Sequence, residues 1–310
     1  MRKSIKVLTI CSRNSNNIAP FITEQVESLK ANGMDIDIFG IVGKGVFGYL
    51  RNAFRIRNIV KKTKPDLIHA HYGLSGLASR LFTSRPLVIT FHGSEAYIPN
   101  VRYLSCLAAK LSTYNIFVEE KLKQRIGGTN KSATLPCGIN LNVFYPVNKK
   151  IAREMIGFEQ DKKYILFSSR FNNPVKQFSL AKSAVGKLNM QIEILELSNK
   201  TRSEVNLLLN ACDVALLTSK SEGSPQFIKE AMACNCPIVS TDVGDIKNII
   251  GNTEGCYLTT FEPQDIANKI KSAINFGKRT NGREKIMHFD NKLISGKIVE
   301  VYKRVLNNNE

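Results

Sequence analysis

The sequence predicts an α/β protein with two doubly wound, Rossmann-like domains. Three observations lead to this prediction: the length of 310 residues, the alternation of short apolar runs with longer amphipathic runs, and the recurrence of that alternation in both halves of the chain. Such a length exceeds one ordinary domain and suits two domains of roughly 100–200 residues each. Strands that alternate with helices form parallel sheets.

The expected strands are short and apolar, and helical patterns separate them. In the first half we expect strands at 5–10, 34–41, 66–70, 87–91, 115–118 and 132–135. In the second half we expect them at 164–169, 191–195, 214–218, 237–240 and 256–258. The run at 21–32 has the spacing of an amphipathic helix. Thr201 and Glu204 form a capping-box pattern that predicts the start of another helix.

A segment rich in turn residues, 138–148 with Pro146, predicts the linker between the domains. We therefore assign 1–143 to the first domain and 144–292 to the second. In open parallel sheets, ligands bind beyond the carboxyl ends of the strands. Two such domains that face one another would form a cleft lined by both sets of loops.

Composition points to a globular cytoplasmic protein. No apolar run approaches the ~18 residues of a membrane span, and the apolar stretch near the N-terminus is too short for a secretory signal. The seven cysteines are odd in number and mostly lie in apolar runs, which indicates reduced thiols. Cys234 and Cys236 have no second pair for zinc, so we expect no metal site.

The net charge is +18, and positive charge is densest in residues 44–64. This segment carries seven cations and no acid, interleaved with aromatic and aliphatic residues. This pattern predicts a basic amphipathic helix. It favours an anionic membrane surface, and a solvated helix that covers the sheet is the alternative. Nucleic acid is a rival partner for a basic chain, but no nucleic-acid module is recognisable, so we expect none to bind.

The segment 219–250 contains the most informative pattern, because two carboxylates flank a turn that opens a helix. Gly223 frees the backbone, Ser224 is the expected N-cap, and Pro225 suits the first helical position. The start of such a helix attracts phosphate. Glu230 lies almost two turns later and can accept hydrogen bonds from two adjacent ribose hydroxyls, while Glu222 can bind a sugar hydroxyl.

The stretch EGSPQFIKEAMACNCPIVSTDVGD resembles the Glu-x7-Glu signature of the family 4 retaining glycosyltransferases, which are nucleotide-sugar enzymes of the GT-B fold. PDLIHAHYGLSG, PLVITFHGSEA, LPCGINLNVFYP and SSRFNNPVKQFSLAKSAV resemble other blocks of that family in the same order. The resemblance covers most of the chain. Within the family, the chain is most similar to bacterial members that build cell-surface polysaccharides of the teichuronic acid type.

The resemblance implies a donor site in the second domain. Arg170 and Lys176 resemble the family's cations that hold the donor diphosphate. The residues implied to bind the same diphosphate at the helix start are Ser224, Pro225, Gln226 and Phe227. Glu222 and Gly223 are implied to bind the donor sugar, and Glu230 the ribose.

The first domain is implied to bind the acceptor. His92 resembles the family's histidine that contacts the donor sugar near the reacting centre, so we assign it the catalytic role. The family usually has a glycine-rich loop after its first strand, where this chain has a segment without glycine that includes Asn16 and Asn17. These two residues, with His71 and Tyr72, are expected on the acceptor side. The final helix, 293–310, is implied to pack back on this domain.

The implied reaction is hexosyl transfer from a nucleoside-diphosphate sugar to a lipid-linked or oligosaccharide acceptor, with retention of configuration and without metal or cofactor. It belongs to cell-surface polysaccharide synthesis, in the cytoplasm or on the inner face of the plasma membrane. One alternative is a non-catalytic or epimerase-type protein of the same fold that binds sugar nucleotides. An epimerase would isomerise the donor without an acceptor. A basic nucleic-acid-binding protein is the remaining alternative.

Overall fold

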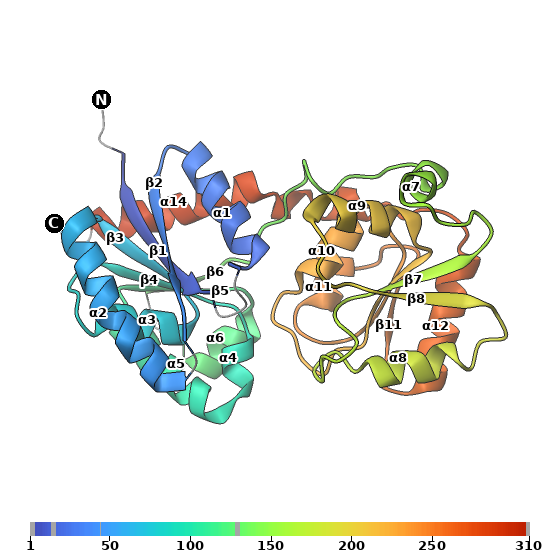
Figure 1. Cartoon of the computed structure of the whole chain (residues 1–310), viewed down its shortest axis with the longest axis horizontal. Coiled ribbons are helices and arrows are strands. Elements are labelled where there is room, and N and C mark those ends of the chain that lie inside the picture. Colours follow the sequence, from blue (N-terminus) through green and yellow to red (C-terminus); the bar gives the residue numbers. More distant parts are fainter. Residues whose placement is uncertain (1–3, 14–16, 44, 128–130, 308–310) are drawn as a thin grey trace. The chain divides into compact units, whose positions relative to one another are not determined.

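The computed structural model describes residues 4–13, 17–43, 45–127 and 131–307, and these form two compact α/β units (Figure 1). Unit 1 combines Met1–Gly138 with Asn291–Glu310, and unit 2 is Ile139–Asp290. Each unit has a parallel sheet, which confirms the predicted fold class of two doubly wound α/β domains. The chain therefore leaves unit 1 after Gly138 and returns to it at Asn291.

The described strands of unit 1 are β1 (Lys6–Ser12), β2 (Asp35–Ile41), β3 (Leu67–His71), β4 (Leu87–Phe91), β5 (Tyr114–Phe117) and β6 (Ser132–Thr134). Its helices are α1 (Pro20–Ala31), α2 (Gly45–Thr63), α3 (Gly73–Arg80), α4 (Ser94–Tyr97), α5 (Pro99–Leu111), α6 (Glu120–Ile126) and α14 (Asn291–Asn307). The strand order is β2-β1-β3-β4-β5-β6. The order reverses direction between β1 and β3, so this is the switch point where a doubly wound sheet binds ligands.

Helices cover both faces of the unit 1 sheet. On one face, α1 and α14 bury apolar side chains such as Val26 and Ile298 against β1, β3, β4 and β5. On the other face, α2, α3, α5 and α6 cover the strands (Figure 1). Tyr302 of α14 also makes a polar contact, because its hydroxyl lies 2.6 Å from Nδ1 of the buried His69 on β3. The last helix is thus an integral part of unit 1.

The described strands of unit 2 are β7 (Lys163–Phe167), β8 (Ile192–Glu196), β9 (Val214–Leu217), β10 (Ile238–Thr241) and β11 (Cys256–Thr259). Its helices are α7 (Lys149–Ile156), α8 (Phe178–Val185), α9 (Arg202–Ala211), α10 (Gln226–Ala233), α11 (Ile246–Ile250), α12 (Pro263–Asn275), α13 (Gly282–Lys285) and the 3-10 helix η1 (Met287–Phe289). The strand order β11-β10-β9-β7-β8 puts the switch point between β7 and β9. α9 and α10 cover one face of the sheet, and α8 and α12 cover the other.

Two local predictions about helix starts had different outcomes. The capping box at Thr201 and Glu204 is confirmed, with both reciprocal hydrogen bonds present. The N-cap predicted at Ser224 is wrong: α10 begins at Gln226, and Pro225 is its N-cap. Pro225 has a ψ of 122°, which is extended rather than helical, so it cannot occupy the first helical position.

All seven cysteines are free, and five of them are buried. Among the helices that the structure describes, none combines the length and the apolar character needed to cross a membrane.

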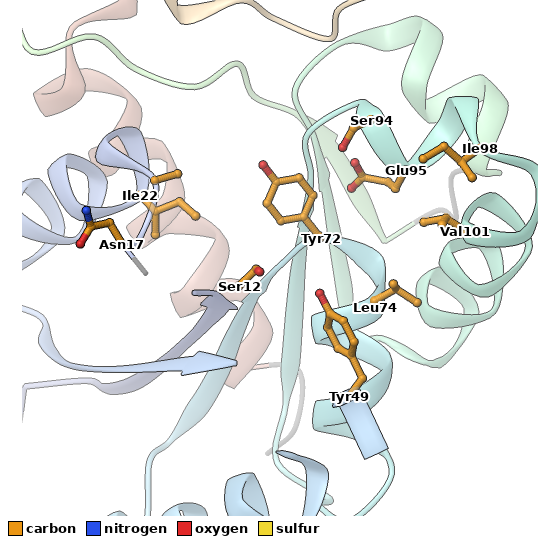
Figure 2. Close-up of a pocket in the computed structure, with 11 residues that line it drawn as sticks. Ser12, Asn17, Ile22, Tyr49, Tyr72, Leu74, Ser94, Glu95, Ile98 and Val101 are labelled. Carbon is orange, nitrogen blue, oxygen red and sulfur yellow. The ribbon is translucent and has the colours of Figure 1, made fainter. Parts of the chain in front are cut away.

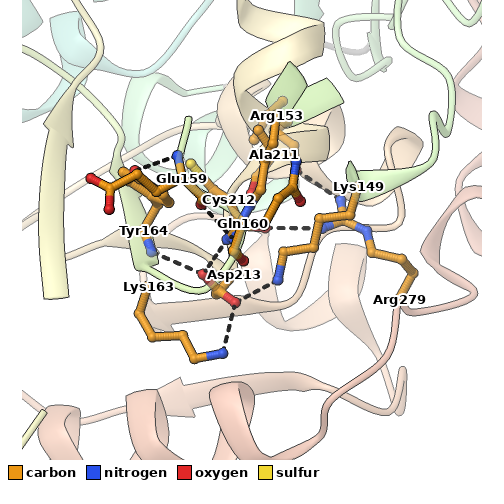
Figure 3. A network of polar contacts seen from close by, with 11 residues as sticks. Lys149, Arg153, Glu159, Gln160, Lys163, Tyr164, Ala211, Cys212, Asp213 and Arg279 are labelled. Atoms are coloured by element: carbon orange, nitrogen blue, oxygen red, sulfur yellow. Dashed lines mark hydrogen bonds and ion pairs between the residues drawn. The ribbon is translucent and has the colours of Figure 1, made fainter. Parts of the chain in front are cut away.

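An ion-pair network joins α7 to the start of β9 (Figure 3). Arg153 is 2% exposed, and its Nη2 lies 3.0 Å from Oδ2 of Asp213. Its other nitrogen atoms donate to the carbonyl oxygens of Ala211, Glu159 and Gln160. A buried guanidinium needs a carboxylate and a full set of acceptors to offset its desolvation. Asp213 supplies that carboxylate.

We expect Asp213→Ala to lower the free energy of unfolding of unit 2 by about 3–5 kcal/mol, because it leaves the buried Arg153 charge uncompensated. Urea unfolding followed by circular dichroism measures this change. Glu193→Ala is the matched control, since it removes an exposed carboxylate that pairs with Lys162 at 2.7 Å. The control should lose less than about 1 kcal/mol. Equal losses of stability in the two variants would show that Asp213 does not compensate the buried Arg153 charge.

Candidate functional site

The loops after β7 and β9 meet at the carboxyl edge of the unit 2 sheet. Nζ of Lys176, from the first loop, donates to Oε1 of Glu222, from the second. Ser219 Oγ donates to the same carboxylate oxygen at 2.5 Å. The Lys176 and Glu222 side chains are only 18% and 15% exposed. This ion pair spans the β7/β9 switch point and joins two residues that the sequence assigned to diphosphate and sugar.

Arg170 lies on the other side of the end of β7, against the loop that follows β8. Its Nε is 3.1 Å from Ser198 Oγ, and its Nη2 is 2.8 Å from Asn199 Oδ1. These partners are uncharged, and Arg170 is exposed. Arg170 and Lys176 therefore flank β7 at the predicted donor edge, but each contacts a different neighbouring loop.

Glu230 is 3% exposed on α10 and pairs with Arg202, the first residue of α9. Arg202 Nη1 lies 2.7 Å from Glu230 Oε1, and the guanidinium also lies over the Phe144 ring at 4.4 Å from its centroid. The role of Arg202 was not predicted. The capping box marks the start of α9 in the sequence, but no local pattern indicates that α9 packs beside α10.

The first residues of α10 form a partly polar, partly buried terminus. Pro225 has no N–H, so it cannot be one of the amide donors predicted for a phosphate; Ser224, Gln226 and Phe227 retain theirs. Both polar atoms of the Gln226 side chain are buried, and the described residues offer them no hydrogen-bond partner. An unsatisfied buried amide costs about 1–3 kcal/mol, so we expect an ordered water molecule or a polar ligand to complete the hydrogen bonds of Gln226.

Lys229, Ser224 and the partly buried Asp245 form a polar cluster behind this terminus. Lys229 is 0% exposed, and its Nζ donates to Ser224 Oγ at 2.6 Å. Burial raises the pKa of the Asp245 carboxyl, while the Lys229 charge and the Ser224 hydroxyl act in the opposite direction. A lysine and an aspartate that are 16 positions apart give no recognisable sequence signal, and neither was predicted. The cluster holds the side chain of Ser224 next to the predicted phosphate site.

Backbone contact also fixes this region. The Asp245 N–H donates to the Gly223 carbonyl at 3.1 Å. Gly244 has a φ of +62°, and a Cβ there would lie 2.1 Å from the Gly223 oxygen. Only glycine fits at 244, because a side chain would meet both steric overlap and an unfavourable backbone conformation. The loops after β9 and β10 are therefore packed directly against each other.

In unit 1, His92 follows β4 and sits in a cluster of aromatic and histidine rings. Its Nε2 is 2.9 Å from His71 Nδ1, and its Nδ1 is 3.4 Å from Cys137 Sγ. The Tyr72 ring lies 4.7 Å from it, centroid to centroid. Both ring nitrogens of His92 thus have partners inside unit 1. His71 is fully buried, and burial lowers its pKa, so it is a neutral partner that positions His92.

A cavity of about 520 Å³ opens at the β1/β3 switch point of unit 1 (Figure 2). Glu95 lies in its wall, 3% exposed, and accepts hydrogen bonds from the backbone amides of His92 and Gly93, each at 3.0 Å. Burial raises the pKa of this carboxyl. The rings of Tyr49 and Tyr72 lie along the cavity (Figure 2). The other lining residues are Ser12, Asn17, Ala19, Ile22, Leu74, Ser94, Ile98 and Val101.

The four residues predicted on the acceptor side have different outcomes. Asn17 and Tyr72 line the unit 1 cavity. His71 does not, because its side chain is completely buried behind His92. Asn16 lies outside the described residues. Within the described part of the chain, no three or more His, Cys, Asp or Glu side chains are grouped so that they could hold a metal ion.

Family comparisons cover both units. Residues 21–143 match the family model described as Glycosyltransferase Family 4, and residues 182–286 match the one described as Glycosyl transferases group 1. The chain belongs to the family 4 glycosyltransferases. This membership agrees with the resemblance found in its motifs.

Several glycosyltransferases are similar to this family member in sequence. One from Methanocaldococcus jannaschii is 27% identical over 73% of this chain and 71% of its own length. TuaC of Bacillus subtilis, named for teichuronic acid biosynthesis, is 26% identical over 70% of this chain and 64% of its own length. The N,N'-diacetylbacillosaminyl-diphospho-undecaprenol alpha-1,3-N-acetylgalactosaminyltransferase of Campylobacter jejuni is 24% identical, over 92% of this chain and 90% of its own length.

Solved structures support the GT-B fold. A sucrose-phosphate synthase from Thermosynechococcus elongatus has a TM-score of 0.83 at 16% identity and covers 98% of this glycosyltransferase and 100% of its own chain. HepE of Anabaena in complex with UDP has a TM-score of 0.75 at 17% identity, with 97% of this chain and 100% of its own chain covered. At these identities the likeness shows the fold alone.

We expect Lys229→Met to lower the free energy of unfolding of unit 2 by about 1–3 kcal/mol near pH 7, because it removes the hydrogen bond to Ser224 and the positive charge that favours the ionised form of the Asp245 carboxyl. The pKa of Asp245 is raised in the folded protein, so its ionised form is what burial penalises. The loss should therefore grow as the pH rises from about 4, near the unfolded pKa, to about 7. Urea unfolding at a series of pH values measures it.

The double variant Lys229→Met with Asp245→Asn is the control, since it removes the carboxylate that titrates. Its loss of stability should be nearly independent of pH over the same range. If the single variant shows no more pH dependence than the double variant, Lys229 and Asp245 are not coupled.

Proposed function

We propose that this glycosyltransferase moves a hexose from a nucleoside-diphosphate sugar to a lipid-linked or oligosaccharide acceptor, with retention of configuration, during cell-surface polysaccharide synthesis. The observation that carries the proposal is the Lys176–Glu222 pair at the β7/β9 switch point, because it joins a cation suited to diphosphate and a carboxylate suited to sugar hydroxyls. The HepE structures with UDP and with UDP-glucose support a nucleotide-sugar donor. The names of TuaC and of the Campylobacter transferase support a surface-glycan role.

Donor binding would separate the Lys176–Glu222 pair. Lys176 would turn to the diphosphate, and Glu222 would accept hydrogen bonds from the sugar. The exchange replaces one partly buried ion pair by two charge-assisted contacts, so neither group is left unpaired. In this arrangement Glu222 binds the donor and is not a general acid.

Charge stabilisation is the proposed source of catalysis. As the bond from the sugar to the diphosphate breaks, negative charge grows on the departing phosphate. Arg170, Lys176 and the amides of Gln226 and Phe227 would stabilise that charge, each at about 3 kcal/mol if it acts like an oxyanion-hole donor. The acceptor hydroxyl would attack from the leaving-group side, and the departing phosphate would take its proton. His92 would contact the donor sugar near this point.

The unit 1 cavity is the proposed acceptor site. The described residues that line it include no lysine or arginine, so it is poorly suited to a phosphate group. The rings of Tyr49 and Tyr72 and the hydroxyls of Ser12 and Ser94 suit an uncharged sugar ring. We propose that the sugar of the acceptor enters this cavity, while any lipid diphosphate stays outside it.

The exposed surface of α2 is the proposed membrane contact. Phe47 is 87% exposed, Phe54 is 56% exposed and Leu50 is 40% exposed. The exposed cations of the same helix are Arg51, Arg55, Arg57, Lys61 and Lys62. Apolar and cationic side chains on one helix bind anionic bilayers through burial and charge together. A peripheral position on the inner face of the plasma membrane would bring a lipid-linked acceptor to unit 1.

The ribose assignment of Glu230 predicts a specific change in nucleotide preference. Wild-type protein should bind UDP about tenfold or more tightly than 2'-deoxy-UDP, because the carboxylate accepts a charge-assisted hydrogen bond from the 2'-hydroxyl. Glu230→Ala should bind the two nucleotides equally, as measured by isothermal titration calorimetry. Arg202→Ala is the matched control: it breaks the same ion pair but keeps the carboxylate, so it should keep the preference. Loss of the preference in both variants would argue against a ribose contact.

The membrane assignment predicts that the wild-type protein floats with phosphatidylglycerol vesicles and much less with phosphatidylcholine vesicles. Phe47→Ser with Phe54→Ser should reduce flotation about tenfold or more, because two exposed aromatic side chains no longer enter the bilayer. Phe261→Ser removes an aromatic side chain that is 46% exposed on unit 2 and should have no effect. Equal flotation of all variants would exclude α2 as the contact.

A further inference from the structure

Unit 2 contains a second cavity, of about 390 Å³, at the amino ends of its strands. Lys163 begins β7, Asp213 directly precedes β9, and Pro237 directly precedes β10, and all three line the cavity. The predicted donor residues follow the carboxyl ends of the strands, at the opposite edge of the same sheet. A ligand in this cavity therefore cannot take part in sugar transfer.

The walls of this cavity carry a large excess of positive charge. Its described lining contains five cations, Lys149, Lys150, Lys163, Lys278 and Arg279, and a single acid, Asp213. That acid is already shared. Its Oδ1 lies 2.5 Å from Lys149 Nζ and 3.8 Å from Lys163 Nζ, and its Oδ2 accepts from Arg153 (Figure 3). One carboxylate thus serves three cations.

The remaining cations are not neutralised by buried carboxylates either. Arg279 donates to the backbone carbonyls of Cys212, Leu209 and Cys234, which are uncharged acceptors. Lys278 lies 3.6 Å from Glu254, but both side chains are largely exposed, so this pair contributes little. The concave surface therefore keeps a strongly positive potential.

The start of α7 adds to this potential. The helix begins in the cavity wall with Lys149 and Lys150 in its first turn, after the N-cap Asn148. Cations at a helix N-terminus oppose the helix dipole and destabilise the helix. A sequence that breaks such a local rule usually does so for function. A bound anion would offset both the dipole and the lysines.

We propose that this cavity binds a small ligand through a phosphoryl or diphosphoryl group, at a site separate from sugar transfer. The cavity volume lies in the range of small-molecule sites. Lysines bind phosphate as point charges, and a helix N-terminus favours the same anion. Lys149, Lys150 and Lys163 hold the anion. Asp213 keeps Lys149 and Arg153 in place. The phosphoryl group belongs either to a free metabolite or to a lipid headgroup.

The test uses the full chain and inorganic pyrophosphate. Arg170→Ala with Lys176→Ala is the background, so that pyrophosphate bound at the proposed donor site does not obscure the result. In this background, Lys150→Ala with Lys163→Ala should weaken pyrophosphate binding about tenfold or more by isothermal titration calorimetry. Lys182→Ala with Lys187→Ala removes the same charge from exposed positions on α8 and in the turn after it, and should leave the affinity unchanged. Thermal melting checks that both double variants remain folded.

A second arm identifies the source of the phosphoryl group. The same variants, with Phe47→Ser and Phe54→Ser added to remove the proposed α2 contact, are mixed with vesicles that contain phosphatidic acid. A loss of pyrophosphate affinity with unchanged vesicle binding supports a free ligand, and a loss of both supports a lipid headgroup. If the cavity variant and its control bind both probes equally, the proposal is overturned.

Discussion

The packing of Gly244 against the carbonyl of Gly223 determines the geometry of the donor half. Because a Cβ at 244 would lie 2.1 Å from that oxygen, the loops after β9 and β10 can approach this closely only with glycine there. The contact brings Asp245 to the loop of Ser224, where Lys229 donates to the serine hydroxyl. The start of α10 and Glu222 are fixed as a consequence. Lys176 and Arg170 then approach this edge from the loop after β7.

The polar cluster and the glycine contact have a shared role. A predicted phosphate site at a helix start depends on backbone amides, which cannot adjust as side chains do. The ion pair of Glu230 with Arg202 ties α10 to α9, and the hydrogen bond from Lys229 to Ser224 ties α10 to the loop after β9. The hydrogen bond from the Asp245 N–H to the Gly223 carbonyl ties that loop to the loop after β10. These contacts preorganise the helix start before a donor arrives.

Much of the fold could be predicted from the sequence, because strand and helix patterns are local. The apolar runs that became β1 and β4 and the capping box of α9 are examples. The N-cap of α10 was predicted one residue early, at Ser224. Proline is common at the first helical position, and the prediction placed Pro225 there, but proline is equally compatible with the extended ψ that Pro225 has as N-cap. Arg202, Lys229 and Asp245 were missed because their roles arise only when α9, α10 and the loop after β10 pack together. The burial of His71 was not predicted either, since the sequence does not show that His92, at the end of the neighbouring strand, packs against it.

The position of α14 has a consequence for synthesis of the protein. Unit 2 is one continuous stretch, Ile139–Asp290, whereas unit 1 needs Ile298 and Tyr302 from the end of the chain to cover a face of its sheet and to contact His69. On the ribosome, N-terminal domains usually fold first. Here the order is reversed, because the middle of the chain can complete its core while the first 138 residues still expose an apolar sheet face. The N-terminal half is therefore the part that relies on protection from aggregation until α14 has been synthesised.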